Sequence, residues 1–217
     1  PWASAGEVTI ANGGDIAKRF SALPPQALIP ESDGNQGGGT SSLPSLVTAS
    51  FQLPSVQLMR WANNGTLAVA TENSILLYDT NALDSSARQL PGDMENITSL
   101  AISPDSLWLA AGLENGQILL WSLANNDPPN VLADHTWAVK ALAFSPNSNL
   151  LLSGGGILNS KPNGLEVIQF FEDTEVRVWD VKTGSKIRQL SNPKGQITTL
   201  GISADGTTVM AGTNDVD

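Results

Sequence analysis

Four segments of this chain superimpose without a gap, and this repetition constrains the fold more than any other feature of the sequence. They are MRWANNGTLAVAT, LAISPDSLWLAAG, LAFSPNSNLLLSG and LGISADGTTVMAG, beginning at Met59, Leu100, Leu142 and Leu200. Each consists of two alternating stretches around a tight turn, and the residue types in that turn tolerate positive φ. These turn pairs are Asn64-Gly65, Asp105-Ser106, Asn147-Ser148 and Asp205-Gly206. Each segment therefore predicts a pair of antiparallel strands.

A third strand follows the pair in each of the first three units. Its strongest copy is TEVRVWDVKTG, from Thr174 to Gly184, which predicts a half-buried strand and then a turn at Thr183-Gly184. Weaker copies are SILLYDTNA and QILLWSLAN, and a leucine recurs ahead of the turn in three units, at Leu90, Leu132 and Leu190. The residues before successive turns are 41, 42 and 58 positions apart. Four short strands in about 42 residues is the period of a propeller blade.

These residues resemble the WD-repeat β-propeller family from Phe51 to Asp217. One unit is the closest match: Asp134-His135 stands where the family usually has Gly-His, and Trp179-Asp180 closes the unit. In that family a buried His, Ser or Thr, Asp and Trp form a hydrogen-bonded tetrad within a blade. By position, the resemblance assigns this structural tetrad to His135, Ser153, Asp173 and Trp179.

The other units depart from the family pattern. Asp93 and Pro193 take the place of the histidine, and Glu72 and Asn115 take the place of the aspartate. Their tetrads are therefore expected to be absent or partial. The segment Ala68 to Asp79 also resembles the first repeat of bacterial extracytoplasmic propellers, which favours a bacterial extracytoplasmic location over the cytoplasmic alternative.

The predicted fold is all-β: a β-propeller of four-stranded antiparallel blades in an incomplete ring. Propellers have roughly four to eight blades, whereas three units here are complete and a fourth is partial, so we expect a fragment of a longer propeller. Residues 1–50, rich in Pro, Gly and Ser, predict a lead-in or linker, with a degenerate strand pair as the alternative. Residues 51–217 predict the blades.

Composition limits the chemistry of the chain. It has 11 basic and 21 acidic residues, a net charge of −10, one histidine and no cysteine. A field of that sign repels phosphate backbones and anionic membranes, and no apolar run has the length of a membrane span. We therefore expect no nucleic-acid partner, no membrane insertion, no catalytic residues, no metal site and no cofactor. The set of Ser153, His135 and Asp173 is similar to a catalytic relay, but the family resemblance makes it structural.

The candidate partner-binding residues are Trp137, Lys161 and Asn163. Trp137 stands at a position that lies on the narrower face of the ring in the family, and tryptophan is favoured at interface hot spots. Lys161 and Asn163 belong to an insertion of about residues 155–172, in which Lys161-Pro162-Asn163-Gly164 predicts the turn of a hairpin on the same face. Packing of Trp137 on its own blade and neutral drift of the insertion remain the alternatives.

Two further patterns have ordinary structural interpretations. Glu172, Asp173 and Glu175 form the densest group of carboxylates, which indicates a solvated strand edge. The glycine runs at 37–39 and 154–156 lack the lysine and helix of a phosphate-binding loop and predict flexible turns.

The favoured function is a non-catalytic scaffold or protein-interaction module that presents rim loops to a protein partner. The alternative is a sensor or enzyme-associated domain that binds a small ligand in the central channel, and a third possibility is a purely structural spacer. The small number of candidate acids, bases and metal ligands counts against the second hypothesis.

Overall fold

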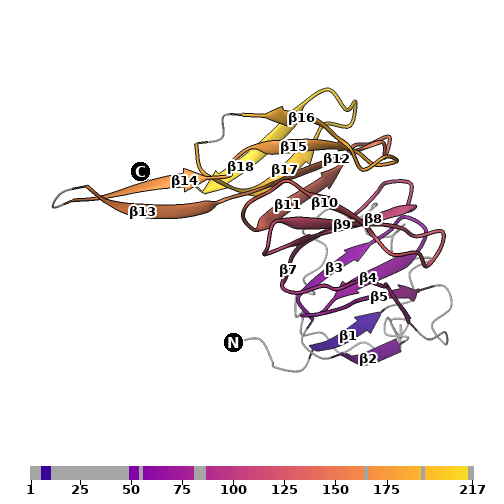
Figure 1. Cartoon of the computed structure of the whole chain (residues 1–217). Coiled ribbons are helices and arrows are strands. Elements are labelled where there is room, and N and C mark those ends of the chain that lie inside the picture. Colours follow the sequence, from indigo (N-terminus) through magenta and orange to yellow (C-terminus); the bar gives the residue numbers. More distant parts are fainter. Residues whose placement is uncertain are drawn as a thin grey trace, which may run out of the picture.

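The computed structural model describes residues 6–10, 49–53, 56–80, 87–163, 166–191 and 194–214, in which all regular secondary structure is β-strand. Three four-stranded antiparallel sheets follow one another along the chain (Figure 1). The first blade contains β3 (Leu58–Trp61), β4 (Thr66–Ala70), β5 (Ile75–Asp79) and β6 (Arg88–Gln89). The second contains β7 (Ile97–Ile102), β8 (Trp108–Leu113), β9 (Gln117–Ser122) and β10 (Asn130–Ala133). The propeller-blade architecture is thus confirmed for these units.

The third blade is interrupted by a hairpin. Its strands are β11 (Val139–Phe144), β12 (Leu150–Gly155), β15 (Val176–Asp180) and β16 (Lys186–Leu190), while β13 (Ile157–Asn163) and β14 (Glu166–Glu172) pair only with each other. The β13–β14 hairpin projects away from the stacked blades (Figure 1). It occupies the insertion in which the sequence predicts a hairpin, but the turn predicted at Lys161-Pro162-Asn163-Gly164 is wrong, because Lys161 to Asn163 belong to β13 and Asn163 pairs with Glu166.

Two smaller sheets complete the described structure. A half blade of β17 (Gln196–Ile202) and β18 (Val209–Asn214) follows the third blade, and β1 (Gly6–Ile10) pairs with β2 (Ala49–Leu53). Most of the expected lead-in and its glycine run at 37–39 lie outside the described residues. The boundary at residue 50 therefore stays a prediction.

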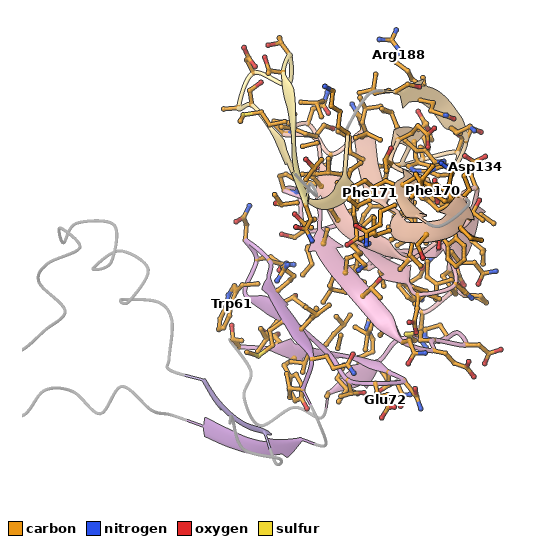
Figure 2. All side chains as sticks on the ribbon, turned by 90° about the vertical axis from the view of Figure 1, so that its left-hand side faces the viewer. Trp61, Glu72, Asp134, Phe170, Phe171 and Arg188 are labelled. Carbon is orange, nitrogen blue, oxygen red and sulfur yellow. The ribbon has the colours of Figure 1, made fainter. Side chains whose placement is uncertain are left out.

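The blades meet through their innermost strands, because β7 contacts both β3 and β11, and β11 also contacts β17. Within the described residues, no blade packs on the other side of the first innermost strand, β3, and its Met59 and Trp61 are 45% and 53% exposed. Trp61 projects from this blade in Figure 2. This arrangement places the strand ends and turns of all blades at two opposite faces.

The tight turns have the conformation that their sequences predict. Gly65, Ser106, Ser148 and Gly206 have φ values of 88°, 62°, 60° and 73°. In the second blade the Asp105 side chain stabilises the turn, since its Oδ1 accepts hydrogen bonds from Ser103 Oγ at 2.5 Å and Leu107 N at 3.0 Å. Asn147 and Asp205 accept the equivalent pair of hydrogen bonds in the two following units. The repeated sequence therefore specifies a repeated turn.

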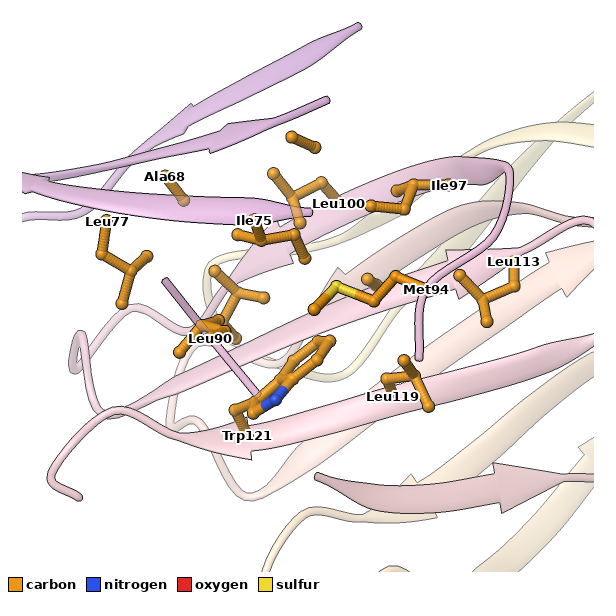
Figure 3. Close-up of a cluster of buried hydrophobic side chains, with 13 residues drawn as sticks. Ala68, Ile75, Leu77, Leu90, Met94, Ile97, Leu100, Leu113, Leu119 and Trp121 are labelled. Carbon is orange, nitrogen blue, oxygen red and sulfur yellow. The ribbon is translucent and has the colours of Figure 1, made fainter. Parts of the chain in front are cut away.

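The middle strands do not follow the alternating pattern predicted for them. Every residue of β8 from Leu109 to Leu113 is buried, as are Leu151 to Gly155 of β12. Neighbouring blades cover both faces of these strands: in β12, for example, Leu151 belongs to the cluster shared with the second blade and Leu152 to the one that includes Ile197 of the half blade. A buried cluster between the first two blades includes Ile75, Met94 and Trp121 (Figure 3).

The glycines at 154–156 are not flexible turns. Gly154 and Gly155 lie within β12, where a Cβ on Gly155 would be 2.0 Å from the carbonyl oxygen of Ala138. A Cβ on Gly154 would be 2.8 Å from Ile197 in the half blade. Gly156 has a φ of 108° and forms the root of the hairpin. Close packing, not flexibility, requires glycine at these positions.

Candidate partner-binding site

The root of the hairpin lies against the loop formed by residues 134–138, between β10 and β11. The two segments are at the same end of the third blade because Val139, at the start of β11, pairs with Gly155, at the end of β12. Gly116 of the second blade also packs on this loop, since a Cβ there would be 2.3 Å from the His135 carbonyl oxygen. Loop and hairpin root therefore form one continuous part of the surface.

Below this surface, a hydrogen-bonded chain joins the four residues assigned to the tetrad. Trp179 Nε1 donates to Ser153 Oγ at 2.8 Å, and His135 Nε2 lies 2.8 Å from the same oxygen. His135 Nδ1 lies 3.3 Å from Asp173 Oδ1. Ser153 is fully buried and the His135 side chain is 0% exposed. The hydroxyl of Ser153 is therefore enclosed within the blade, between His135 and Trp179.

Arg177 adds a fifth residue to this hydrogen-bonded network. The sequence analysis did not predict its role. The alternating pattern of β15 predicts an outward side chain, but Arg177 is only 6% exposed. Its Nη1 donates to Asp173 Oδ1 at 2.5 Å and contacts His135 Nδ1, while its Nε donates to Asp134. A buried guanidinium requires such carboxylate partners. Asp134, where the family usually has glycine, is the one sequence signal that could have indicated this arrangement.

Charge pairing sets the ionisation of both aspartates. Burial alone would raise the pKa of Asp173, but hydrogen bonds from His135 and Arg177 lower it to about 2. The pKa of Asp134 is lowered chiefly by its hydrogen bond with Lys186, whose Nζ lies 2.8 Å from each carboxylate oxygen. Both groups therefore carry negative charge next to Arg177 at neutral pH.

Asp173 connects the buried chain to the surface loop. Its Oδ2 accepts hydrogen bonds from the backbone N–H groups of Thr136 at 2.7 Å and Trp137 at 3.1 Å. Its side chain is 4% exposed, so the prediction of a solvated carboxylate group at 172–175 is wrong for this residue. The family resemblance, in contrast, assigned Asp173 to the buried tetrad, and its backbone is left-handed, with φ of 55°.

The neighbouring residue, Glu172, attaches the hairpin to the loop. Its Oε2 accepts hydrogen bonds from Trp137 Nε1 at 3.2 Å and from Asn159 Nδ2 at 2.9 Å. Gln196 of the half blade also donates to the carbonyl oxygen of Gly156. The hairpin thus leaves the blade from a root that is held on two sides.

The three candidate binding residues do not form one compact patch. Trp137 is half-buried beside the hairpin root, whereas Lys161 and Asn163 are exposed near the far end of the hairpin. Lys161 Nζ lies 5.5 Å from the centroid of the Phe170 ring. Phe170 and Phe171, labelled in Figure 2, are consecutive residues of β14, and both are half-buried.

The described residues were compared with two further kinds of functional feature, metal-binding groups and membrane-spanning helices. Across them, no group of three or more His, Cys, Asp or Glu side chains is arranged to hold a metal ion. Nor does the described part of the chain contain a helix long and apolar enough to cross a membrane.

Comparisons with known proteins agree with the blade architecture. A family model described as "WD domain, G-beta repeat" matches residues 85–122 and 126–180. The B-type cell cycle switch protein ccs52B of Medicago truncatula is 27% identical over 73% of this chain and 39% of its own length. Protein FIZZY-RELATED 3 of Arabidopsis thaliana is 26% identical over 73% of this chain and 39% of its own. An uncharacterized WD repeat-containing protein of Synechocystis is 32% identical over 67% and 37% respectively.

Solved structures show the same fold. A chain in the "Crystal Structure of Mitotic Checkpoint Complex" aligns with a TM-score of 0.63 and 23% identity, covering 77% of this chain and 49% of its own length. A second structure, of U3-55K, aligns with a TM-score of 0.55 and 21% identity over 67% of this chain and 42% of its own. This chain thus spans less than half the length of each of these relatives.

Proposed function

We propose that this chain, which belongs to the WD-repeat β-propeller family, is a non-catalytic scaffold that binds a protein partner at the hairpin-bearing face of its third blade. The contact surface would comprise Trp137 at the root of the hairpin and Lys161 and Asn163 near its end. In this mechanism the blade holds the contact surface in place for the partner, and no chemical reaction is involved.

The observation that carries the proposal is the attachment of the hairpin. Glu172 and Asp173, adjacent in the chain, hold the loop of residues 134–138 through three hydrogen bonds from Thr136 and Trp137, and Asp173 also pairs with Arg177 of β15. A projecting segment whose root is fixed loses less conformational entropy on binding than a free loop of the same length. The attachment therefore supports a role in recognition.

The buried state of the single histidine supports a non-catalytic role. His135 is enclosed by Ser153, Asp173 and Arg177, and it has no path to a ligand at the surface. A chain that shares this fold was solved in a structure titled as that of the mitotic checkpoint complex, which fits binding of a protein partner.

The proposal is tested by affinity capture with the full-length protein, followed by binding measurements with the purified captured protein. We expect Trp137→Ala combined with replacement of residues 157–172 by a short turn to abolish the interaction. Trp61→Ala is the matched control, because Trp61 is an exposed tryptophan at the opposite end of an innermost strand.

Circular dichroism must show that both variants are folded. Equal binding by the wild type and the double variant would overturn the proposal. Retained binding of a small molecule by that variant, without any protein partner, would instead favour a ligand in the central channel.

A further inference from the structure

The outer edge of β14 differs from the outward strand edges of the three complete blades. Those of the three complete blades are short or protected: β6 has two residues, β10 has four, and β16 carries Lys186 and Arg188 with a register shift in its pairing. Short length, lysine and bulges are the devices by which sheets avoid pairing with other chains.

The two strands of the hairpin also differ in how well their outer edges are protected against pairing with another chain. β13 contains Pro162, which has no N–H to donate, and Lys161. β14 has seven residues, Glu-Val-Ile-Gln-Phe-Phe-Glu, with no proline, no glycine and no charge between its terminal glutamates. Its pairing with β13 is regular from Glu166 to Glu172. β14 therefore keeps a straight row of backbone groups on its free side.

β14 also carries apolar side chains that an added strand would cover. The register places Phe170 and Ile168 on one face of the hairpin and Phe171 on the other. Ile168 is 40% exposed, and Leu158, opposite Phe171, is 38% exposed. In strand addition the backbone supplies affinity and such alternating side chains supply specificity.

We propose that β14 binds an extended segment of a protein partner by strand addition, and that this segment alternates bulky apolar residues with lysine or arginine. The inference rests on the proposed binding function and specifies how the hairpin recognises its partner. Charge decides the occupant: the chain has a net charge of −10, which attracts a cationic segment and repels a second copy of the same chain.

The test uses the intact protein and a synthetic peptide of seven residues, the length of β14, that alternates isoleucine and lysine. Binding is measured by fluorescence anisotropy at low and high salt. A control peptide has the same side chains but N-methyl groups on alternate amides, which block backbone pairing without changing charge. We expect binding of the first peptide and none of the second.

A matched pair of substitutions locates the edge. Gln169→Lys on β14 and Ser160→Lys on β13 add the same charge at directly paired, exposed positions on one face. We expect Gln169→Lys to weaken binding about tenfold and Ser160→Lys less than about threefold, because only the first lies on the free β14 edge.

Four results would overturn the inference. The N-methylated peptide binding as tightly as its parent would exclude backbone pairing. Equal weakening by the two lysine substitutions would exclude the β14 edge. Dimerisation in analytical ultracentrifugation that only Gln169→Lys abolishes would make a second copy the occupant. Loss of a captured partner on removing the hairpin, but not with Gln169→Lys, would leave the proposed function intact and refute strand addition alone.

Discussion

The second and third blades each bury a tryptophan, but the surroundings of its indole ring are apolar in the second blade and polar in the third. In the third blade the indole N–H of Trp179 donates to Ser153, within a buried chain that contains His135, Asp173 and Arg177. In the second blade the indole N–H of the equivalent Trp121 donates to the backbone carbonyl of Pro91 at 2.8 Å. Apolar side chains surround Trp121, and Met94 packs beside it (Figure 3).

The difference follows from a few residues. The position of Ser153 is occupied by Ala111 in the second blade, and that of His135 by Asp93. Without a hydroxyl and an imidazole, the second blade fills its interior with apolar side chains and needs no buried ion pair. The third blade has a buried arginine that requires carboxylates, and one of these carboxylates also holds the surface loop. In the third blade, polar contacts therefore connect the buried residues to the hairpin. In the second blade, the contacts of Trp121 are with other buried apolar side chains and the Pro91 carbonyl.

The largest expected effect is on the polar blade. Asp173→Ala removes a partner of buried Arg177 and the acceptor for the N–H groups of Thr136 and Trp137. Arg177 keeps Asp134 as a partner, but the variant breaks one buried ion pair and leaves two backbone N–H groups without their acceptor. We expect it to lower the free energy of unfolding by about 3–5 kcal/mol, as measured by urea denaturation. Asp127→Ala, at an exposed aspartate, should change it by less than about 0.5 kcal/mol. Similar losses in the two variants would refute this role for Asp173.

A smaller loss is expected in the apolar blade. Met94→Ala leaves a cavity beside Trp121, and we expect a decrease of about 2–3 kcal/mol in the free energy of unfolding, because neighbouring side chains partly fill the space. Met94→Leu, which nearly conserves volume, should cost less than about 1.5 kcal/mol. A greater loss for Met94→Ala than for Asp173→Ala would reverse the ranking of the two blades.

Acid should destabilise the polar blade selectively. The pKa of Asp173 is about 2 in the folded protein, below its ordinary value of 3.8. A depressed carboxyl pKa stabilises the folded state fully above the unfolded value, and this contribution is lost as pH falls from about 4 to about 2. We expect the difference in unfolding free energy between wild type and Asp173→Asn to shrink over that window. The difference between wild type and Met94→Ala should stay constant, and a parallel change in both would contradict the assignment.

The smallest effect concerns the surface end of the polar chain. Trp137→Phe keeps an aromatic ring but removes the hydrogen bond from Nε1 to Glu172. We expect a loss of about 0.5–1 kcal/mol in unfolding free energy, together with faster amide hydrogen exchange at the hairpin root. Unchanged exchange there would show that Glu172 does not hold the hairpin through Trp137.

Much of the fold was predictable from local sequence, but the site was predictable only in part. The turn pairs and the Trp-Asp closing strand repeat at a regular spacing, and each predicts its own local geometry. The resemblance to WD repeats named His135, Ser153, Asp173 and Trp179, which the structure joins. Arg177 was missed because strand periodicity places it outward, and the glycines at 154–156 were misread because glycine in a sequence does not distinguish a turn from a close contact.

Local sequence was enough to predict the repeat, the all-β fold, the four tight turns of the repeated segments and the presence of a hairpin in the third unit. All of these depend on residues close together in the chain, whose conformational preferences are local. The burial of Arg177, the position of Asp173 between the interior and the loop, and the unprotected edge of β14 became visible only in the three-dimensional structure. Those properties depend on which strands and loops from distant parts of the chain lie against each residue, and a one-dimensional pattern does not contain that information.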